Sequence, residues 1–139
     1  MGRLLAIDYG RKRCGIAVTD PLRIVATALA TVPAAKLVEY VQAYVAANAV
    51  DRIIVGLPTT MRGEPSESMR YITPALGRLR KALPEMEIVM WDERFTSTLA
   101  HRAMIDGGYS RSDRRDKEAI DRMAAVIILN SYLDSNQNQ

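Results

Sequence analysis

Three apolar runs in which polar residues do not alternate with apolar ones most strongly constrain the fold of this chain. They lie within residues 3–8, 52–57 and 86–91, and each is too short to be a typical buried helix. A strand that is apolar on both faces belongs in a sheet that is covered on both sides, as in parallel and mixed α/β sheets. We therefore predict three buried strands over these ranges.

The segments between and after these strands predict the remaining elements. Residues 14–20 and 24–31 have the length and composition of two more strands, which continue the first one as a meander. Apolar residues at helical spacing predict four helices. The first has Pro33 in its first turn and ends at Asn48, and the others extend over about 66–83, 97–106 and 116–133. Pro74 is expected to kink or split the second of these helices.

Strands that are connected through a helix normally form parallel, right-handed crossovers. The predicted order of three strands, helix, strand, helix, strand, helix, helix therefore indicates an α/β fold. We expect a mixed five-stranded sheet with helices on its faces, in the element order of the ribonuclease H-like fold.

The length and composition favour one globular domain over residues 1–139. Cys14 is the single cysteine and cannot form an internal disulfide, which favours the reducing cytoplasm. No apolar stretch approaches the roughly 20 residues of a membrane span, and the first residues do not have the pattern of a signal peptide. We thus expect a cytoplasmic protein with no membrane partner.

Basic residues are clustered in two parts of the chain, although the net charge is only +3. Such clusters are often no more than solvated surface, but beside acidic residues they are typical of an enzyme that binds nucleic acid. The residues concerned are Arg11, Lys12 and Arg13 in one loop, Arg94, and Arg111, Arg114 and Arg115 in another loop.

Two acidic residues follow buried strands directly. Asp8 follows the apolar run of the first strand, and Glu93 comes just after the strand that ends near Trp91. Ligand sites in mixed α/β sheets gather at the carboxyl ends of parallel strands, so both carboxylates are candidates for such a site. The alternatives are that Asp8 caps a turn and that Glu93 decorates the start of the following helix.

Asp121 is a third acidic candidate, in the last predicted helix. The residues three, four and seven positions later are Ala124, Ala125 and Ile128, so this face of the helix should turn Asp121 toward the sheet. A buried carboxylate needs a metal or a hydrogen-bonding partner. Lys117, four residues earlier, is one candidate partner, and a simple Lys117–Asp121 pair is the alternative to a metal site.

We expect Glu118 and Arg122 on the solvent side of this helix. Three carboxylates from two strand ends and a facing helix provide the hard oxygen ligands that Mg²⁺ or Mn²⁺ prefers. Two such ions can activate a water molecule for the hydrolysis of a phosphodiester. With one His (His101) and one Cys, the chain is poorly supplied for zinc or for Ser-His-Asp chemistry.

The motif from Asp8 to Asp20 resembles the opening motif of the YqgF/RuvX family. Later motifs of that family are matched in order by Val55-Gly56-Leu57-Pro58, by Asp92-Glu93-Arg94 and by Lys117 with Asp121, Ala124 and Ala125. The resemblance implies a ribonuclease H-like fold and a metal-dependent nuclease of the bacterial cytoplasm. It also implies that Asp8, Glu93 and Asp121 are the acidic triad, and it associates the family with the maturation of pre-16S rRNA and with branched DNA.

The leading hypothesis is a nuclease that cuts structured RNA, in which Lys117 or Arg94 neutralises the scissile phosphate. Because aromatic residues make up only 6% of the chain, recognition by shape and phosphate is expected rather than extensive base stacking. A Holliday junction resolvase, a non-catalytic nucleic-acid-binding module and a nucleotide-binding phosphotransferase are alternatives. A resolvase would need a homodimer to cut two strands, whereas RNA trimming is compatible with a monomer.

Overall fold

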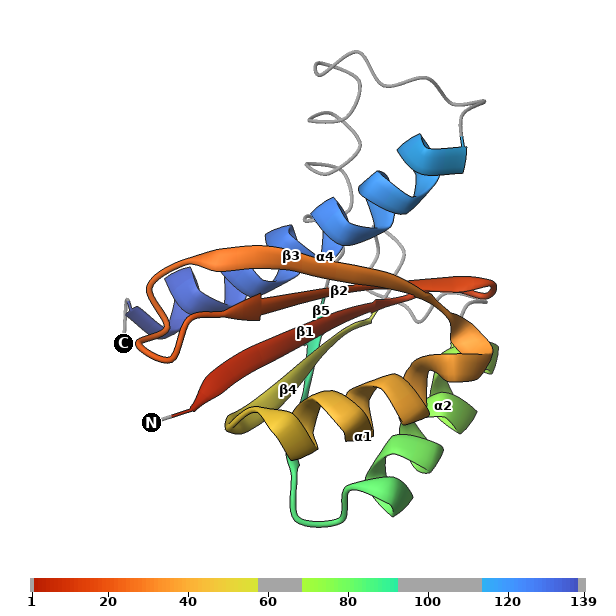
Figure 1. Ribbon diagram of the computed structural model, residues 1–139, viewed down its shortest axis with the longest axis horizontal. Helices are drawn as coiled ribbons and strands as arrows, with labels where there is room; N and C mark the ends of the chain where they lie inside the picture. Colours follow the sequence, from red (N-terminus) through yellow and green to blue (C-terminus); the bar gives the residue numbers. More distant parts are fainter. Residues whose placement is uncertain (1, 58–68, 93–113, 138–139) are drawn as a thin grey trace.

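The computed structural model describes residues 2–57, 69–92 and 114–137. Its elements follow the predicted order (Figure 1), and they are β1 (Arg3–Tyr9), β2 (Arg13–Thr19), β3 (Ala26–Pro33), the 3₁₀ helix η1 (Ala34–Lys36), α1 (Leu37–Ala47), β4 (Val50–Leu57), α2 (Met69–Ala82), β5 (Glu87–Asp92) and α4 (Arg114–Gln137). The helix predicted over 97–106 lies outside the described residues.

The five strands form one mixed sheet in the order β3-β2-β1-β4-β5. β1 pairs antiparallel with β2, and β2 with β3, whereas β4 is parallel to both β1 and β5. The predicted meander and the parallel crossovers are therefore confirmed. Because β1 and β4 are central, their residues are buried on both faces, as their unbroken apolar runs predicted.

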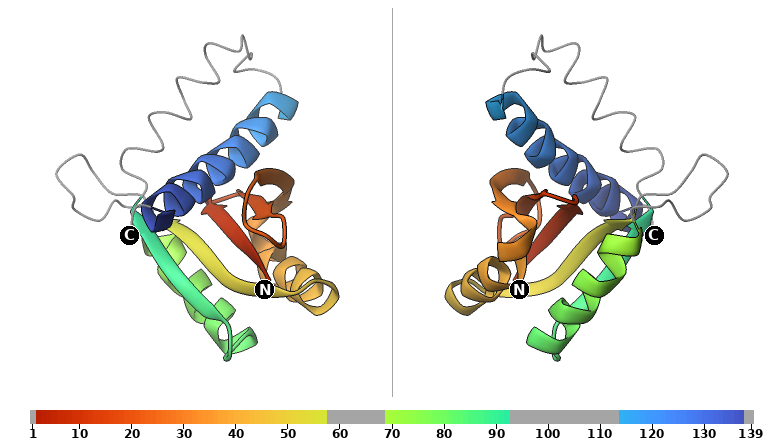
Figure 2. Two further views of the ribbon diagram at one scale, coloured as in Figure 1. Left: turned by 90° about the vertical axis from the view of Figure 1, so that its left-hand side faces the viewer. Right: turned by 90° about the vertical axis from the view of Figure 1, so that its right-hand side faces the viewer.

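Helices cover both faces of the sheet (Figure 2). α1 and α2 lie on one face, where a cluster that includes Leu5, Ile7, Ile53, Ile72 and Leu79 is buried. α4 crosses the other face, over a second buried cluster that includes Leu4, Ala6, Ala17, Ile128 and Leu129. None of the described helices is long and apolar enough to cross a membrane.

The second helix is not split at Pro74, contrary to one of the two outcomes expected for it. α2 runs as one element from Met69 to Ala82 with Pro74 inside it. Pro74 lies on the exposed side of the helix, whereas Ile72, Leu76 and Leu79 are buried against the sheet. The lost backbone hydrogen bond therefore falls where water can replace it, and core packing holds the helix together.

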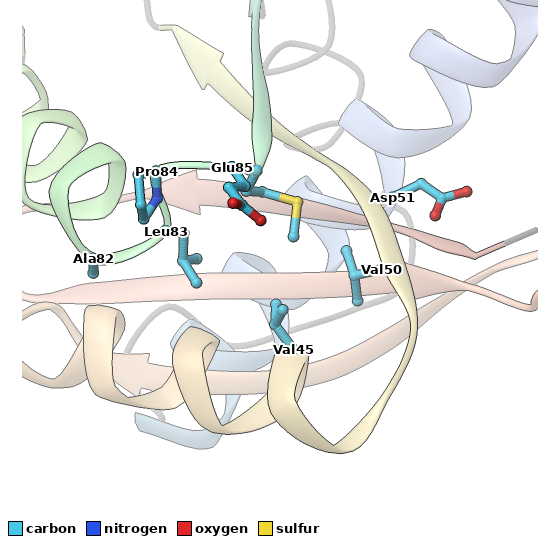
Figure 3. Close-up of a pocket in the computed structure, with 8 residues that line it drawn as sticks. Val45, Val50, Asp51, Ala82, Leu83, Pro84 and Glu85 are labelled. Carbon is cyan, nitrogen blue, oxygen red and sulfur yellow. The ribbon is translucent and has the colours of Figure 1, made fainter.

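A pocket of about 500 Å³ lies at the end of the sheet where β4 begins (Figure 3). Apolar residues line most of it, and its two charged residues, Asp51 and Glu85, are acidic. Asp51 already accepts hydrogen bonds from the Gly2 backbone N–H and from Arg23. An apolar and acidic pocket is unsuited to a phosphate backbone, which is negatively charged.

Candidate active site

Asp8 lies near the carboxyl end of β1, on the face of the sheet that α4 covers. Strand alternation places it on the same side as Leu4 and Ala6, both of which pack in the cluster beneath α4. Its partners on the neighbouring strands are both glycines, Gly15 on β2 and Gly56 on β4. The absence of side chains at these two positions leaves room beside the carboxylate for a ligand or for another element of the protein.

The backbone of α4 passes directly over Gly15 of β2. A Cβ atom added to Gly15 would lie 1.8 Å from the backbone oxygen of Asp121, a distance that no real side chain could occupy. Ala6 and Ala17, which pair with each other across β1 and β2, also have small side chains that allow α4 to pack close to the sheet. Small residues on the sheet thus bring Asp121 to the strand position that is paired with Asp8.

The side chain of Asp121 points toward the sheet, as its apolar helix face predicted, and only 20% of it is exposed. Its partner is Arg13 on β2, whose Nε donates a hydrogen bond of 2.7 Å to Oδ2 of Asp121. The sequence had suggested Lys117 as one candidate partner and Arg13 as a contact to nucleic acid. Lys117 lies in the first turn of α4, together with Arg114 and Arg115.

Desolvation dominates the electrostatics of Asp121. Burial raises the pKa of its carboxyl above the usual value, and the hydrogen bond and charge of Arg13 lower it by less than burial raises it. Glu118, one turn earlier, adds to the increase in the pKa. A carboxylate held in this way gains from a further positive charge nearby, which is the electrostatic requirement for a metal ligand.

Two hydrogen bonds attach the amino-terminal half of α4 to β3. The hydroxyl of Thr31 donates to the backbone oxygen of Glu118 at 2.8 Å, and Nη1 of Arg122 donates to the same hydroxyl at 3.1 Å. Arg122 is therefore not on the solvent side, contrary to the sequence-based expectation, because its long side chain reaches back to the edge of the sheet. These bonds fix the part of α4 that carries Asp121.

A polar pocket of about 230 Å³ opens beside the pair of Arg13 and Asp121. Its lining comes from the β1–β2 turn, from β3 and from α4, and it comprises Lys12, Arg13, Thr31, Val32, Pro33 and Glu118. Lys12 is exposed, so it can meet an anion that enters the pocket from solvent.

Arg11 and Arg13, which flank Lys12 at the β1–β2 turn, contact different helices. Arg13 contacts Asp121 on the α4 face, whereas the guanidinium of Arg11 lies 5.1 Å from the centre of the Tyr71 ring on α2. Sequence reasoning did not single out Tyr71. The signal was available, since Tyr71 is an aromatic residue beside the buried stripe of α2 rather than within it.

Trp91, near the end of β5 and two residues before Glu93 in the sequence, is anchored to α4. The indole Nε1 of Trp91 donates to Oγ of Ser131 at 3.1 Å, and its ring meets that of Tyr132 edge to face, with centroids 5.3 Å apart. β5 ends at Asp92. Glu93, Arg94 and Arg111 lie outside the described residues, and within the described part of the chain no three His, Cys, Asp or Glu side chains form a group that could hold a metal ion.

The pKa of the Cys14 thiol is affected by burial and by the acidic residues of this site. Cys14 is buried, and burial raises the pKa of its thiol to about 12; the negative charges of Asp8 and Asp121 add to the increase. The Cys14 side chain itself belongs to the buried cluster on the face of the sheet that α1 and α2 cover. We predicted Cys14 as a small core side chain, and its burial confirms this.

Native Cys14 is expected to resist thiol reagents at pH 8. With a pKa of about 12, roughly one thiol in 10⁴ is ionised at that pH, against about a quarter for an ordinary cysteine. Labelling by a chromogenic disulfide reagent should be on the order of 10³-fold slower in buffer than in denaturant. Rapid labelling of the native protein would contradict the burial of this thiol.

Comparison with known proteins finds relatives over nearly the whole chain. The RuvX family model, described as Holliday junction resolvase, matches residues 2–135. A protein of Phocaeicola vulgatus named "Putative pre-16S rRNA nuclease" is 50% identical over 99% of this chain and 99% of its own length. A protein of the same name from Parabacteroides distasonis is 47% identical over 100% of this chain and 99% of its own.

Among solved structures, RuvC from T. thermophilus in complex with a Holliday junction substrate has a TM-score of 0.61 and 16% sequence identity. The match covers 99% of this chain and 96% of that one. At this identity the likeness concerns the fold, and it confirms the predicted ribonuclease H-like architecture. Because the family match spans nearly the whole chain and relatives share about half of its residues, the chain belongs to the RuvX family.

Proposed function

We propose that this protein is a divalent-metal-dependent nuclease that processes the 5′ end of pre-16S rRNA during ribosome biogenesis in the cytoplasm. The observation that carries the proposal is the half-buried Asp121 carboxylate, which α4 brings to the sheet position paired with Asp8. The names of the relatives that are about half identical to this chain support the same substrate.

The donor set fits a hard divalent cation. Asp8 and Asp121 provide carboxylate oxygens near the carboxyl end of β1, next to the two glycines. The half-buried environment of Asp121 favours an added positive charge. We propose that these two residues hold Mg²⁺ or Mn²⁺ together with Glu93, which follows β5 in the sequence. When bound, such ions supply an activated water and stabilise the leaving oxygen of a phosphodiester.

The remaining residues of the site would position the ligands and the substrate. Arg13 holds the Asp121 carboxylate in one orientation through its 2.7 Å hydrogen bond, so we assign it a positioning role in addition to any contact with phosphate. Lys117 and Arg94 are proposed to neutralise the scissile phosphate. Contacts to the nucleic-acid backbone are assigned to the exposed Arg11 and Lys12 and to Arg111, Arg114 and Arg115.

Cleavage of a four-way DNA junction is the second candidate activity, because the matching family model is described as Holliday junction resolvase. The two activities differ in what they require. Resolution needs two active sites that cut two strands together, and hence a dimer, whereas trimming of one RNA end needs one site.

The two activities can be separated with purified protein. It is incubated either with a precursor RNA that carries the 5′ extension of 16S rRNA or with a four-way DNA junction, in Mn²⁺, Mg²⁺ or EDTA. We expect metal-dependent shortening of the RNA at its 5′ side and much slower cleavage of the junction. Preferential, paired cuts in the junction would favour the resolvase, and product from neither substrate would favour a non-catalytic binding module.

A further inference from the structure

Tyr71 is an exposed aromatic side chain on a helix that otherwise shows charged and small residues to solvent. It retains 40% of its accessible surface, although the next residue, Ile72, is buried in the core beneath α2. The Tyr71 ring therefore contributes little to the packing of the core. An exposed ring of this kind often has a binding partner, because aromatic side chains supply large contact areas at low entropic cost.

The Tyr71 ring is held in place from one side by a cation. The guanidinium carbon of Arg11 lies 5.1 Å from the ring centroid, which is within the range of a cation–π interaction. This contact joins the β1–β2 turn to the first turn of α2. It restricts the ring before any ligand arrives, so a ligand that stacks on the ring has less side-chain entropy to overcome.

The helix that carries Tyr71 is basic. Residues 69–82 contain four basic residues (Arg70, Arg78, Arg80 and Lys81) and no acidic ones. Arg78 is seven residues after Tyr71 and hence on the same side of the helix, and its positive charge acts to lower the pKa of the Tyr9 hydroxyl at the end of β1. A flat aromatic ring within a basic surface is the combination that single-stranded nucleic acids bind.

This surface adjoins the candidate active site through the β1–β2 turn. Arg11 and Arg13 are two residues apart, yet Arg11 contacts α2 on one face of the sheet and Arg13 contacts α4 on the other. Figure 1 shows the turn at the same end of the sheet as the start of α2. A strand that crosses the turn can therefore meet Tyr71 on one side and the carboxylates on the other.

We propose that Tyr71, with Arg11 on its ring, is a stacking platform for an unpaired base of the RNA substrate. The inference rests on the proposed function, because it assigns to that substrate a single-stranded segment on the α2 side of the β1–β2 turn. Stacking on an aromatic ring is sequence-tolerant, so the platform would select unpaired RNA over duplex without reading its sequence. One such platform is compatible with the low aromatic content of the chain.

The test measures RNA binding in EDTA, where cleavage cannot contribute. Fluorescence anisotropy is recorded with a labelled RNA hairpin that has a single-stranded 5′ tail and with the same hairpin made blunt, for the wild type and for Tyr71→Ala, Tyr71→Phe and Arg80→Ala. We expect Tyr71→Ala to bind the tailed RNA about tenfold more weakly and the blunt RNA unchanged. Tyr71→Phe keeps the ring and should bind both RNAs like the wild type.

Arg80→Ala is the matched control, because it removes a charge from the same helix without removing the ring. It should weaken the binding of both RNAs by similar, small factors. Circular dichroism and thermal melting show that each variant is folded before it is assayed. If Tyr71→Ala does not fold, Tyr71→Leu replaces it in the comparison with Tyr71→Phe. Leucine keeps apolar bulk at this position but has no ring.

The stacking proposal and the proposed function fail in different ways. If the wild type binds and cleaves RNA but Tyr71→Ala (or Tyr71→Leu) binds the tailed RNA as tightly as the wild type, only the stacking proposal is overturned. Equal weakening toward both RNAs overturns it too, since it would indicate a general effect. If the wild type binds neither RNA, the RNA substrate and the platform are both overturned.

Discussion

Replacement of Asp121 by asparagine is expected to abolish cleavage while leaving the protein at least as stable as the wild type at pH 7. The activity should fall because an amide cannot supply the negative charge that a divalent ion requires. Loss of residues that only orient a ligand commonly costs 10- to 100-fold, so loss of a ligand itself should leave less than ~1% of the activity. Asp8→Asn is expected to have the same effect on cleavage.

The stability of Asp121→Asn follows from the sign of the pKa shift. Because burial raises the pKa of Asp121 above its value of 3.8 in model compounds, the folded state holds the proton more tightly than the unfolded state. The stabilisation from the protonated form is complete below pH 3.8 and is lost as the pH rises through the folded pKa. At pH 7 the ionised carboxylate is therefore unfavourable, whereas an asparagine avoids its desolvation and still accepts a hydrogen bond from Arg13.

Two assays check this prediction: cleavage of precursor RNA in Mn²⁺, and thermal melting at pH 4 and pH 7. The advantage of Asp121→Asn in melting temperature should be larger at pH 7 than at pH 4. Asp134→Asn is the matched control, since it makes the same change on an exposed position of α4 and should leave cleavage unaltered. Full cleavage activity in Asp8→Asn or Asp121→Asn would remove that residue from the proposed metal site.

Gly15→Ala is expected to be the most damaging small change in the described part of the chain. Its Cβ would lie 1.8 Å from the Asp121 backbone oxygen and 2.9 Å from the Arg122 nitrogen, so α4 would have to move away from β2. That movement would strain the hydrogen bonds to Thr31 and the packing of Ile128 and Leu129. Overpacking of a core typically costs about 1–3 kcal/mol. Because the added Cβ would meet the backbone of α4 rather than a flexible side chain, we expect this variant to lose about 3 kcal/mol or more.

Chemical denaturation and thermal melting measure this loss, and a decrease of roughly 10 °C in melting temperature is expected. Gly77→Ala provides the opposite control, because a Cβ at this exposed position inside α2 meets nothing within 4 Å. Alanine has a higher helix propensity than glycine, so Gly77→Ala should stabilise the protein by about 0.5–1 kcal/mol. If Gly15→Ala melted like the wild type, α4 could not approach the sheet as closely as described.

Much of the fold could be read from local sequence patterns. Unbroken apolar runs predicted β1, β4 and β5, and helical spacing predicted α1, α2 and α4, because such patterns depend on burial over a few neighbouring residues. Element ends were less accurate, and the last helix is longer at both ends than the predicted 116–133. The continuity of α2 through Pro74 required knowledge of which side of the helix faces water.

The candidate site was only partly predictable. The inward orientation of Asp121 followed from Ala125 and Ile128 on the same helix face, and both are buried. The contact with Arg13 did not follow, because Arg13 is 108 residues away in the chain and helical spacing suggests only neighbours such as Lys117. Arg122 was misplaced for the same reason, since its acceptor, Thr31, is 91 residues away.

Sequence patterns were sufficient to predict the order of strands and helices, to select Asp8, Glu93 and Asp121 as acidic candidates, and to indicate an anionic partner. Periodicity, strand ends and charge are local properties, so they can be recognised from residues that are close together in the sequence. The contacts made after β1 became known from the folded chain alone: Arg13 contacts Asp121 where Gly15 allows α4 to approach, and Arg11 contacts Tyr71. These contacts depend on the packing of distant segments against opposite faces of one sheet, which no short stretch of sequence contains.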